Sequence, residues 1–204
     1  MNSIYTSRDA WEAFRDRQYE LACHIWIMLM SSALNLDAQR SYQLNYTHVL
    51  VAQQRFEEAE AILQELFDSD PQPIYLHQLA FVAREAGHLS QARDYLLQEK
   101  ARIQPHQPLL LAGNAYELGI VSWLEGQLDT AIEHAQSALK YAQLADDLSA
   151  EGCVHRLLAD LMYVIGNRVG ALKNYEAARH AFSLAGDRFA TNDIDRHMKA
   201  LAAV

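Results

Sequence analysis

Nine histidines give the sequence its main potential for metal chemistry. Several of them follow a carboxylate by four residues, a spacing that places both side chains on one face of a helix. Three such pairs are Glu20/His24, Glu176/His180 and Asp193/His197. A structural zinc site usually needs four ligands and a catalytic site three, whereas each of these pairs offers two. We therefore expect solvated contacts on helix surfaces, with no bound metal and no other cofactor.

Sequence motifs for catalysis are also missing. The chain contains no glycine-rich phosphate loop, no Gly-x-Ser-x-Gly nucleophile elbow and no His-Glu-x-x-His helix. Its two cysteines, Cys23 and Cys153, lie inside apolar helical patterns, which predicts small buried thiols rather than a disulfide framework. We expect a protein that is not an enzyme, and a metal-dependent enzyme is the least favoured alternative.

Composition narrows the class of partner. Half of the 204 residues are apolar, and only eight glycines and four prolines occur, which favours a helical chain with a continuous core over an all-β fold. The formal net charge of −9 argues against binding to nucleic acid or to an anionic membrane surface. Residues 1–17 are charged, unlike a secretory signal, and the longest apolar run, 25–30, is too short to span a bilayer. The expected location is the cytoplasm.

A short pattern recurs along the chain. In its fullest form a glycine is followed two residues later by an apolar residue, and three residues after that by an alanine. Two upstream copies lack the glycine. The five copies are Arg17–Ala22, Gln54–Ala59, Gly87–Ala92, Gly126–Ala131 and Gly166–Ala171.

Each position of this pattern has a physical reason. A glycine just past a helix end adopts the left-handed conformation that closes off the last carbonyl groups. The apolar residue opens the next helix and packs back across the turn, although Arg168 replaces it in the last copy. The alanine lies one turn inside this second helix, where a small side chain lets two antiparallel helices approach closely.

These copies resemble the tetratricopeptide repeat (TPR), a helix–turn–helix unit of about 34 residues. With the alanines in register, small residues also fall at the family's small position in the first helix, namely Ala10, Thr47, Ala80, Gly119 and Ala159. The later repeats are longer, which resembles the extended repeats of kinesin light chains and of Rap-type regulators. The resemblance implies an all-α fold, a right-handed superhelix (α-solenoid) of about five helix–turn–helix repeats in a single domain over residues 1–204.

The register also predicts the boundaries of the repeats and helices. The repeats are expected at 5–37, 38–71, 72–106, 107–147 and 148–185, with a capping helix over 188–202. Within the repeats, helices are expected at 5–16, 19–35, 40–53, 56–68, 73–86, 89–102, 108–125, 128–146, 148–165 and 168–185. All four prolines fall in the loops between these repeats, where they break no helix.

The resemblance further implies that the first helix of each repeat lines a concave binding face. Carried over to this sequence, the expected partner-binding residues are Trp11, His48, His77, Phe81, Arg84, Tyr116, Ile120, Trp123, Arg156, Asp160 and Tyr163. Aromatic and arginine side chains are enriched at binding hot spots, so we expect a scaffold whose ligand is a protein or a peptide. In the alternative interpretation, these aromatic side chains simply pack between helices.

Other functions stay open at this point. A Rap-type regulatory module would sense a small peptide by changing the curvature of the superhelix. A homodimer would fill the groove with a second copy, and the chain's own terminal helix could fill it instead. Related domains hold a C-terminal carboxylate with lysine and asparagine, but Ser7 and Trp11 occupy those positions here, so this clamp is not expected.

Overall fold

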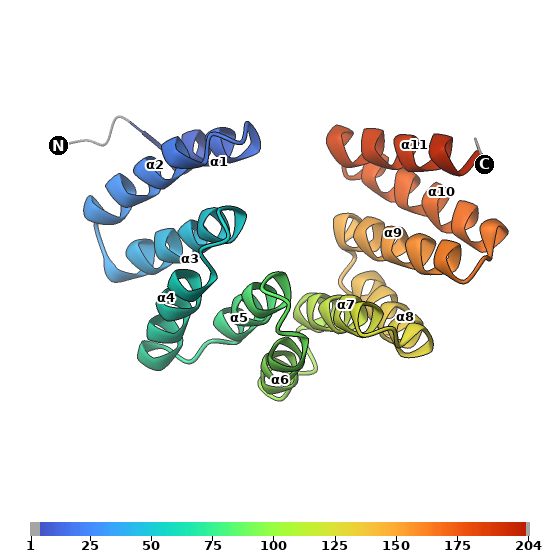
Figure 1. The fold of residues 1–204 in the computed structure, drawn as a ribbon, viewed down its shortest axis with the longest axis horizontal. Helices are drawn as coiled ribbons and strands as arrows, with labels where there is room; N and C mark the ends of the chain where they lie inside the picture. Colours follow the sequence, from blue (N-terminus) through green and yellow to red (C-terminus); the bar gives the residue numbers. More distant parts are fainter. Residues whose placement is uncertain (1–4, 203–204) are drawn as a thin grey trace. The chain divides into compact units, whose positions relative to one another are not determined.

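The computed structural model describes residues 5–202, which form α-helices joined by short turns (Figure 1). Eleven helices and no strand occur in this range, as the predicted all-α class requires. The helices are α1 (Ser7–Arg15), α2 (Tyr19–Ser31), α3 (Leu36–Ala52), α4 (Phe56–Ser69), α5 (Pro73–Glu85), α6 (Leu89–Lys100), α7 (Pro108–Leu124), α8 (Leu128–Leu144), α9 (Leu148–Val164), α10 (Arg168–Leu184) and α11 (Arg188–Ala202). Among the described helices, none is both long enough and apolar enough to cross a membrane.

The predicted helix ends agree with the structure to within two residues, except around the turn between α2 and α3. Helices were expected at 19–35 and 40–53, but α2 ends at Ser31 and α3 begins at Leu36. The reason is the Asn35 side chain, whose oxygen accepts a hydrogen bond from the backbone N–H three residues later at 2.8 Å. An asparagine in this position starts a helix, so the predicted loop moves toward the N-terminus.

The five turns inside the helix pairs share a left-handed residue at the position of the repeat glycine. Gly87, Gly126 and Gly166 have φ angles of 81°, 78° and 80°. Arg17 and Gln54, which replace glycine in the first two copies, have φ angles of 59° and 60°. The turn geometry is therefore kept even where the sequence lacks the residue that adopts it most easily.

The alanine of the pattern is fully buried in every copy, as close helix packing requires. The relative exposure is 0% for all of Ala22, Ala59, Ala92, Ala131 and Ala171. The small residues of the first helices are buried as well, at Ala10, Thr47, Ala80, Gly119 and Ala159. Because both partners at these crossings are small, the helix axes can approach without a cavity.

The helices group into two compact units, here called the N-unit (Met1–Tyr95) and the C-unit (Leu96–Val204), which divide inside α6. The core of the N-unit contains Trp26, Leu50 and Leu63, all at most 1% exposed. The predicted single domain over residues 1–204 and its repeat boundaries stay predictions.

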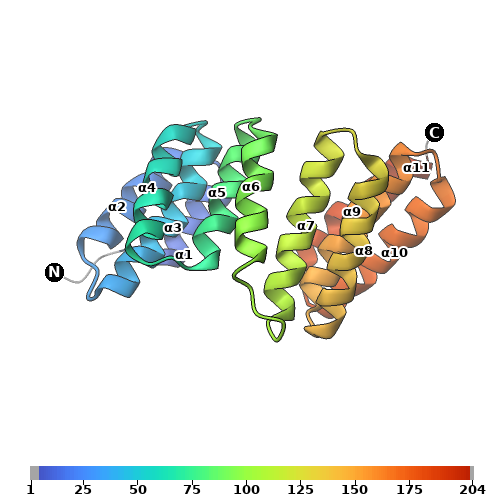
Figure 2. The same cartoon turned by 90° about the horizontal axis from the view of Figure 1, so that it is seen from below.

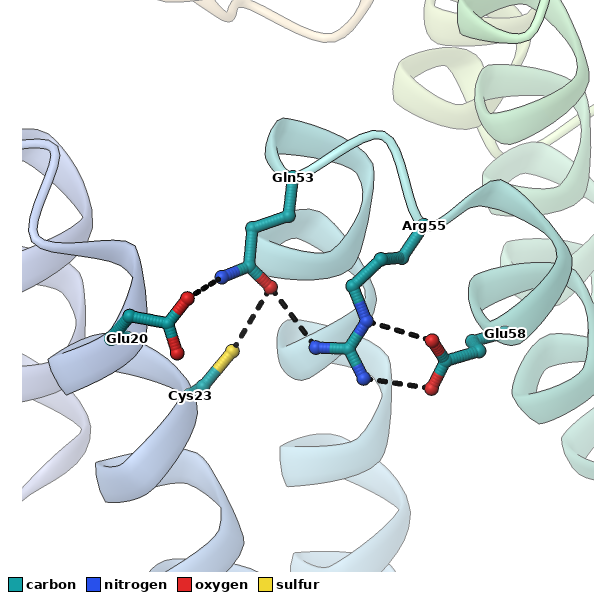
Figure 3. A network of polar contacts seen from close by, with 5 residues as sticks. All are labelled: Glu20, Cys23, Gln53, Arg55 and Glu58. Carbon is teal, nitrogen blue, oxygen red and sulfur yellow. Dashed lines mark hydrogen bonds and ion pairs between the residues drawn. The ribbon is translucent and has the colours of Figure 1, made fainter.

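A network of polar side chains joins the ends of helices in the N-unit (Figure 3). Arg55 makes two hydrogen bonds to the Glu58 carboxylate, both at 2.7 Å. The amide oxygen of Gln53 accepts from Arg55 at 3.1 Å and from the Cys23 thiol at 3.4 Å, while its NH₂ group donates to Glu20 at 2.9 Å. Burial raises the pKa of Cys23, which keeps the thiol protonated, so we assign the network a structural role.

In the C-unit, each helix from α7 to α11 packs against the next along the chain (Figures 1 and 2). Helix α11 covers α10 and buries Ile194 completely. The Arg168 guanidinium, at the start of α10, donates a hydrogen bond of 2.6 Å to the Leu201 carbonyl oxygen near the end of α11. The arginine that departs from the repeat pattern therefore caps the C-terminus of the last helix.

Candidate functional site

In the N-unit, predicted binding residues from three successive first helices form a row of rings. Trp11 on α1 lies 5.7 Å from His48 on α3, and His48 lies 5.7 Å from Phe81 on α5, measured between ring centroids. Arg84, one turn further along α5, places its guanidinium 5.2 Å from the Phe81 ring centroid. We call these four residues the aromatic row.

The aromatic row is partly a packing feature. Trp11 also meets Phe14 and the buried Trp26 edge-on, at centroid distances of 5.4 and 5.8 Å. Both Trp11 and Phe81 pack against the N-unit core as partly buried residues. The alternative interpretation, that aromatic side chains pack between helices, therefore holds in part for this row.

Two histidines lie side by side in the N-unit. Burial lowers the pKa of His48, and the neighbouring His77 lowers it further. His48 is thus held in its neutral form between Trp11 and Phe81, where a charged imidazolium would lose hydration.

The C-unit contains a cavity of about 460 Å³. It is lined by Trp123, Asp160, Tyr163, Val164, Tyr175, His197, Ala200 and Leu201. Trp123 comes from the last turn of α7, and Asp160 and Tyr163 come from α9, so three of the predicted binding residues meet at one place. The volume lies within the roughly 300–1,000 Å³ of typical ligand pockets.

One wall of this cavity is ordered by a hydrogen bond and a ring stack. The Tyr175 hydroxyl donates a short hydrogen bond to Oδ1 of Asp160. The Tyr175 ring stacks on His197, with centroids 5.6 Å apart and planes at 24°. Burial and the bond to Asp160 raise the pKa of Tyr175, so it stays a donor and the carboxylate stays the acceptor at neutral pH.

The other predicted residues of the C-unit lie outside the cavity lining. Tyr116 and Ile120 pack against the core formed by α7, α8 and α9 as partly buried side chains. Burial raises the pKa of the Tyr116 hydroxyl, with a smaller opposing influence from Arg156. Arg156 itself reaches α11, where its guanidinium lies 3.7 Å from the Asp193 carboxylate.

Two chemically important cavity residues were not predicted, Tyr175 on α10 and His197 on α11. Tyr175 belongs to a second helix, which the repeat register assigns to the outer layer. His197 belongs to the terminal helix, which was expected only as a cap. The one pointer in the sequence was the Asp193/His197 spacing, and these two side chains do interact, with His197 Nε2 and Asp193 Oδ2 3.6 Å apart.

No metal-binding constellation is assembled in residues 5–202, since no three histidine, cysteine or acidic side chains gather there in a suitable cluster. Burial raises the pKa of the Cys153 thiol as it does that of Cys23, which disfavours the thiolate that metals and electrophiles require.

No protein-family model matches the sequence, and no curated protein matches it. Several solved structures are similar in fold. TPR-like repeats of a kinesin light chain from Podosopora anserina have 16% identity and a TM-score of 0.60, covering 88% of this chain and 94% of that one. PilF from Pseudomonas aeruginosa has 16% identity and a TM-score of 0.62, with 96% and 89% covered.

A third similar structure is a signal-transduction ATPase of the STAND class with a tetratricopeptide repeat sensor, from Pyrococcus horikoshii. It has 17% identity and a TM-score of 0.66, covering 92% of this chain and 29% of that one. At identities this low, the similarity is informative about the fold alone. For the fold, the predicted resemblance to the tetratricopeptide repeat is confirmed. The chain has the fold of the TPR-like helical repeat proteins.

Proposed function

We propose that this chain is a non-catalytic scaffold that binds a protein or peptide on the faces of its first helices. The observation that carries the proposal is the cavity of about 460 Å³ in the C-unit, where Trp123, Asp160 and Tyr163 converge. Helical repeat proteins commonly bind partners on such surfaces. An aromatic cavity with a few polar groups can anchor one or two side chains of an extended peptide.

The N-unit offers a second contact surface in the aromatic row. Of its polar members, His48 lies between the rings of Trp11 and Phe81, and Arg84 lies over the Phe81 ring. A cytoplasmic location and homodimer formation stay predictions.

The test is selection of short random peptides displayed on phage against the full chain, followed by affinity measurements. We expect selected peptides to lose about tenfold or more in affinity to Trp123→Ala and Tyr163→Ala, because both rings line the cavity. Leu144→Ala is the matched control, since Leu144 is exposed on the second helix α8. Recovery of no binding peptide, or equal losses in the control, would contradict the proposal.

A peptide-sensing regulatory module is the second candidate. The similar structure with a tetratricopeptide repeat sensor supports it. A sensor must change conformation when it binds, so a selected peptide would alter amide hydrogen exchange far from the cavity as well as beside it. Protection confined to α7, α9, α10 and α11, the helices that line the cavity, favours the plain scaffold.

A further inference from the structure

The cavity of the C-unit combines aromatic walls with one acidic group. Trp123, Tyr163 and Tyr175 supply three aromatic rings, and the faces of such rings carry partial negative charge. Among the described lining residues, Asp160 is the one carboxylate, no lysine or arginine occurs, and the one basic side chain is the imidazole of His197. This composition attracts a cation and repels an anion.

Asp160 has an oxygen available to a ligand. Its Oδ1 accepts the hydrogen bond from Tyr175, which fixes the carboxylate, while Oδ2 accepts no hydrogen bond from the described residues. Oδ2 is also not sealed from solvent, since the two side-chain oxygen and nitrogen atoms that are buried without a partner belong to Trp26 and Gln78 among the described residues. A carboxylate fixed on one side and open on the other is pre-organised to accept from a charged donor.

The charge of Arg156 acts on Asp160 but is already engaged in an ion pair elsewhere. Arg156 lies one turn before Asp160 on α9 and makes its ion pair with Asp193 on α11, at 3.7 Å. Arg156 also does not line the cavity. The basic side chain in the described lining is His197, whose Nε2 lies 3.6 Å from the Asp193 carboxylate, so Asp160 has no lysine or arginine partner inside the cavity.

We infer that this cavity holds a single lysine or arginine side chain of the bound peptide, with the charged head at Asp160 and the aromatic rings around it. The inference rests on the proposed function and specifies its ligand. Val164, Ala200 and Leu201 supply apolar surface for the methylene stem of such a side chain. The net charge of −9 also favours the approach of a basic partner over an acidic one.

An uncharged apolar side chain fits this cavity less well. It would cover Asp160 Oδ2 without offering it a donor, and an unpaired carboxylate loses hydration at a cost. A glutamate or aspartate side chain would add repulsion between like charges.

The test uses four small probes on the full-length protein: the N-acetyl methylamides of lysine, arginine, norleucine and glutamate. Binding is read from the Trp123 indole N–H signal in a two-dimensional ¹H–¹⁵N NMR spectrum, assigned with Trp123→Phe. We expect saturable shifts with the lysine or arginine probe and not with the other two. Asp160→Asn should weaken this binding by about tenfold, because it removes the charge while keeping the acceptor for Tyr175.

Glu133→Gln is the matched control, because it removes the same charge from an exposed position on α8. It should leave the probe affinities unchanged. Equal or stronger binding of the norleucine or glutamate probe, no shift with any probe, or full binding by Asp160→Asn would each overturn the inference. The peptide selection described above tests the proposed scaffold independently of this inference. If the selected peptides are apolar or acidic and still depend on Trp123, the scaffold proposal stands and the inference of a bound lysine or arginine is wrong.

Discussion

The hydroxyl of Tyr175 fixes the acidic wall of the cavity through its bond to Asp160. Tyr175→Phe keeps the ring stack on His197 but removes the hydrogen bond to a charged acceptor, so we expect a loss of about 1–2 kcal/mol in the free energy of unfolding. Urea denaturation followed by circular dichroism measures this loss. In the control, Tyr141→Phe, the hydroxyl removed makes no hydrogen bond with the described residues, and its cost should stay below about 0.5 kcal/mol. Equal costs would show that the Tyr175–Asp160 bond contributes nothing.

His48 predicts a pH dependence of stability. Burial and the neighbouring His77 lower its pKa below the ordinary 6.5, so the unfolded chain takes up this proton at a higher pH than the folded chain. The stability from neutral His48 is complete above about pH 6.5 and falls as the pH drops toward the lowered folded pKa. Thermal unfolding of wild type and His48→Gln between pH 7.5 and pH 5, with pH steps of about half a unit, checks this.

In His48→Gln the free energy of unfolding should fall less steeply as the pH drops over that range. The reason is that glutamine cannot take up the proton that His48 takes up on unfolding. The exposed His180 provides the control, as His180→Gln should follow the wild-type curve. Parallel curves for wild type and His48→Gln would show that His48 is not held neutral.

At the scale of the element, the turn inside each helix pair follows from one backbone conformation. Gln54 has a φ of 60° where three other repeats have glycine, and a side chain in this region costs about 1 kcal/mol. Gln54→Gly should therefore raise the free energy of unfolding by about 0.5 kcal/mol, after the added freedom of the unfolded chain is counted. The reverse change, Gly126→Gln, should lower it by about 0.5 kcal/mol by the same accounting. Urea titrations of both variants measure the effect, and a destabilised Gln54→Gly would refute it.

Helix α9 approaches α10 closely at Gly152. A β-carbon placed there would lie 2.6 Å from the Phe182 ring, closer than any real contact, so Gly152→Ala should cost about 2 kcal/mol. Combined with Phe182→Leu, the alanine should cost less than it does alone, because the smaller side chain leaves room for it. Additive losses in urea denaturation would show that the cost of the alanine does not come from the Phe182 ring.

The helices could be predicted because their signals are local. The left-handed turn residue, the buried alanine and the placement of prolines between repeats all depend on neighbours in the sequence. The turn before α3 was misplaced because the prediction followed the repeat register. In the structure, the Asn35 side chain caps the helix and sets its start. Gly152 gave no local sign of its role, since its meaning depends on the Phe182 ring of another helix.

The candidate site could be predicted only in part, for the same physical reason. Trp123, Asp160 and Tyr163 follow from the repeat register, and the structure gathers them at one cavity. Tyr175 and His197 also line the cavity, but they lie on helices that the register does not assign to the binding face. Their position at the cavity therefore depends on tertiary packing. Arg156 and Tyr116 occupy equivalent positions of the repeat register but do not line the cavity. Arg156 forms an ion pair with Asp193 on α11, and Tyr116 packs against the core.

At the scale of the whole molecule, the chain is a series of helix pairs, and we propose that the first helices form the surface for a partner. Its described helices divide into an N-unit with the aromatic row and a C-unit with the cavity. Each unit has its own buried core, so each surface can be altered while the other is preserved. This makes it practical to test the two surfaces separately.

The most direct test of partner binding at the cavity is photo-crosslinking in living cells. The photoreactive residue benzoylphenylalanine would replace Tyr163, which lines the cavity, or Leu144, which is exposed on α8. We predict that irradiation gives a discrete protein adduct from position 163, that Trp123→Ala in the same chain abolishes it, and that position 144 gives none. An adduct that survives Trp123→Ala, or that forms equally at position 144, would contradict partner binding at this cavity.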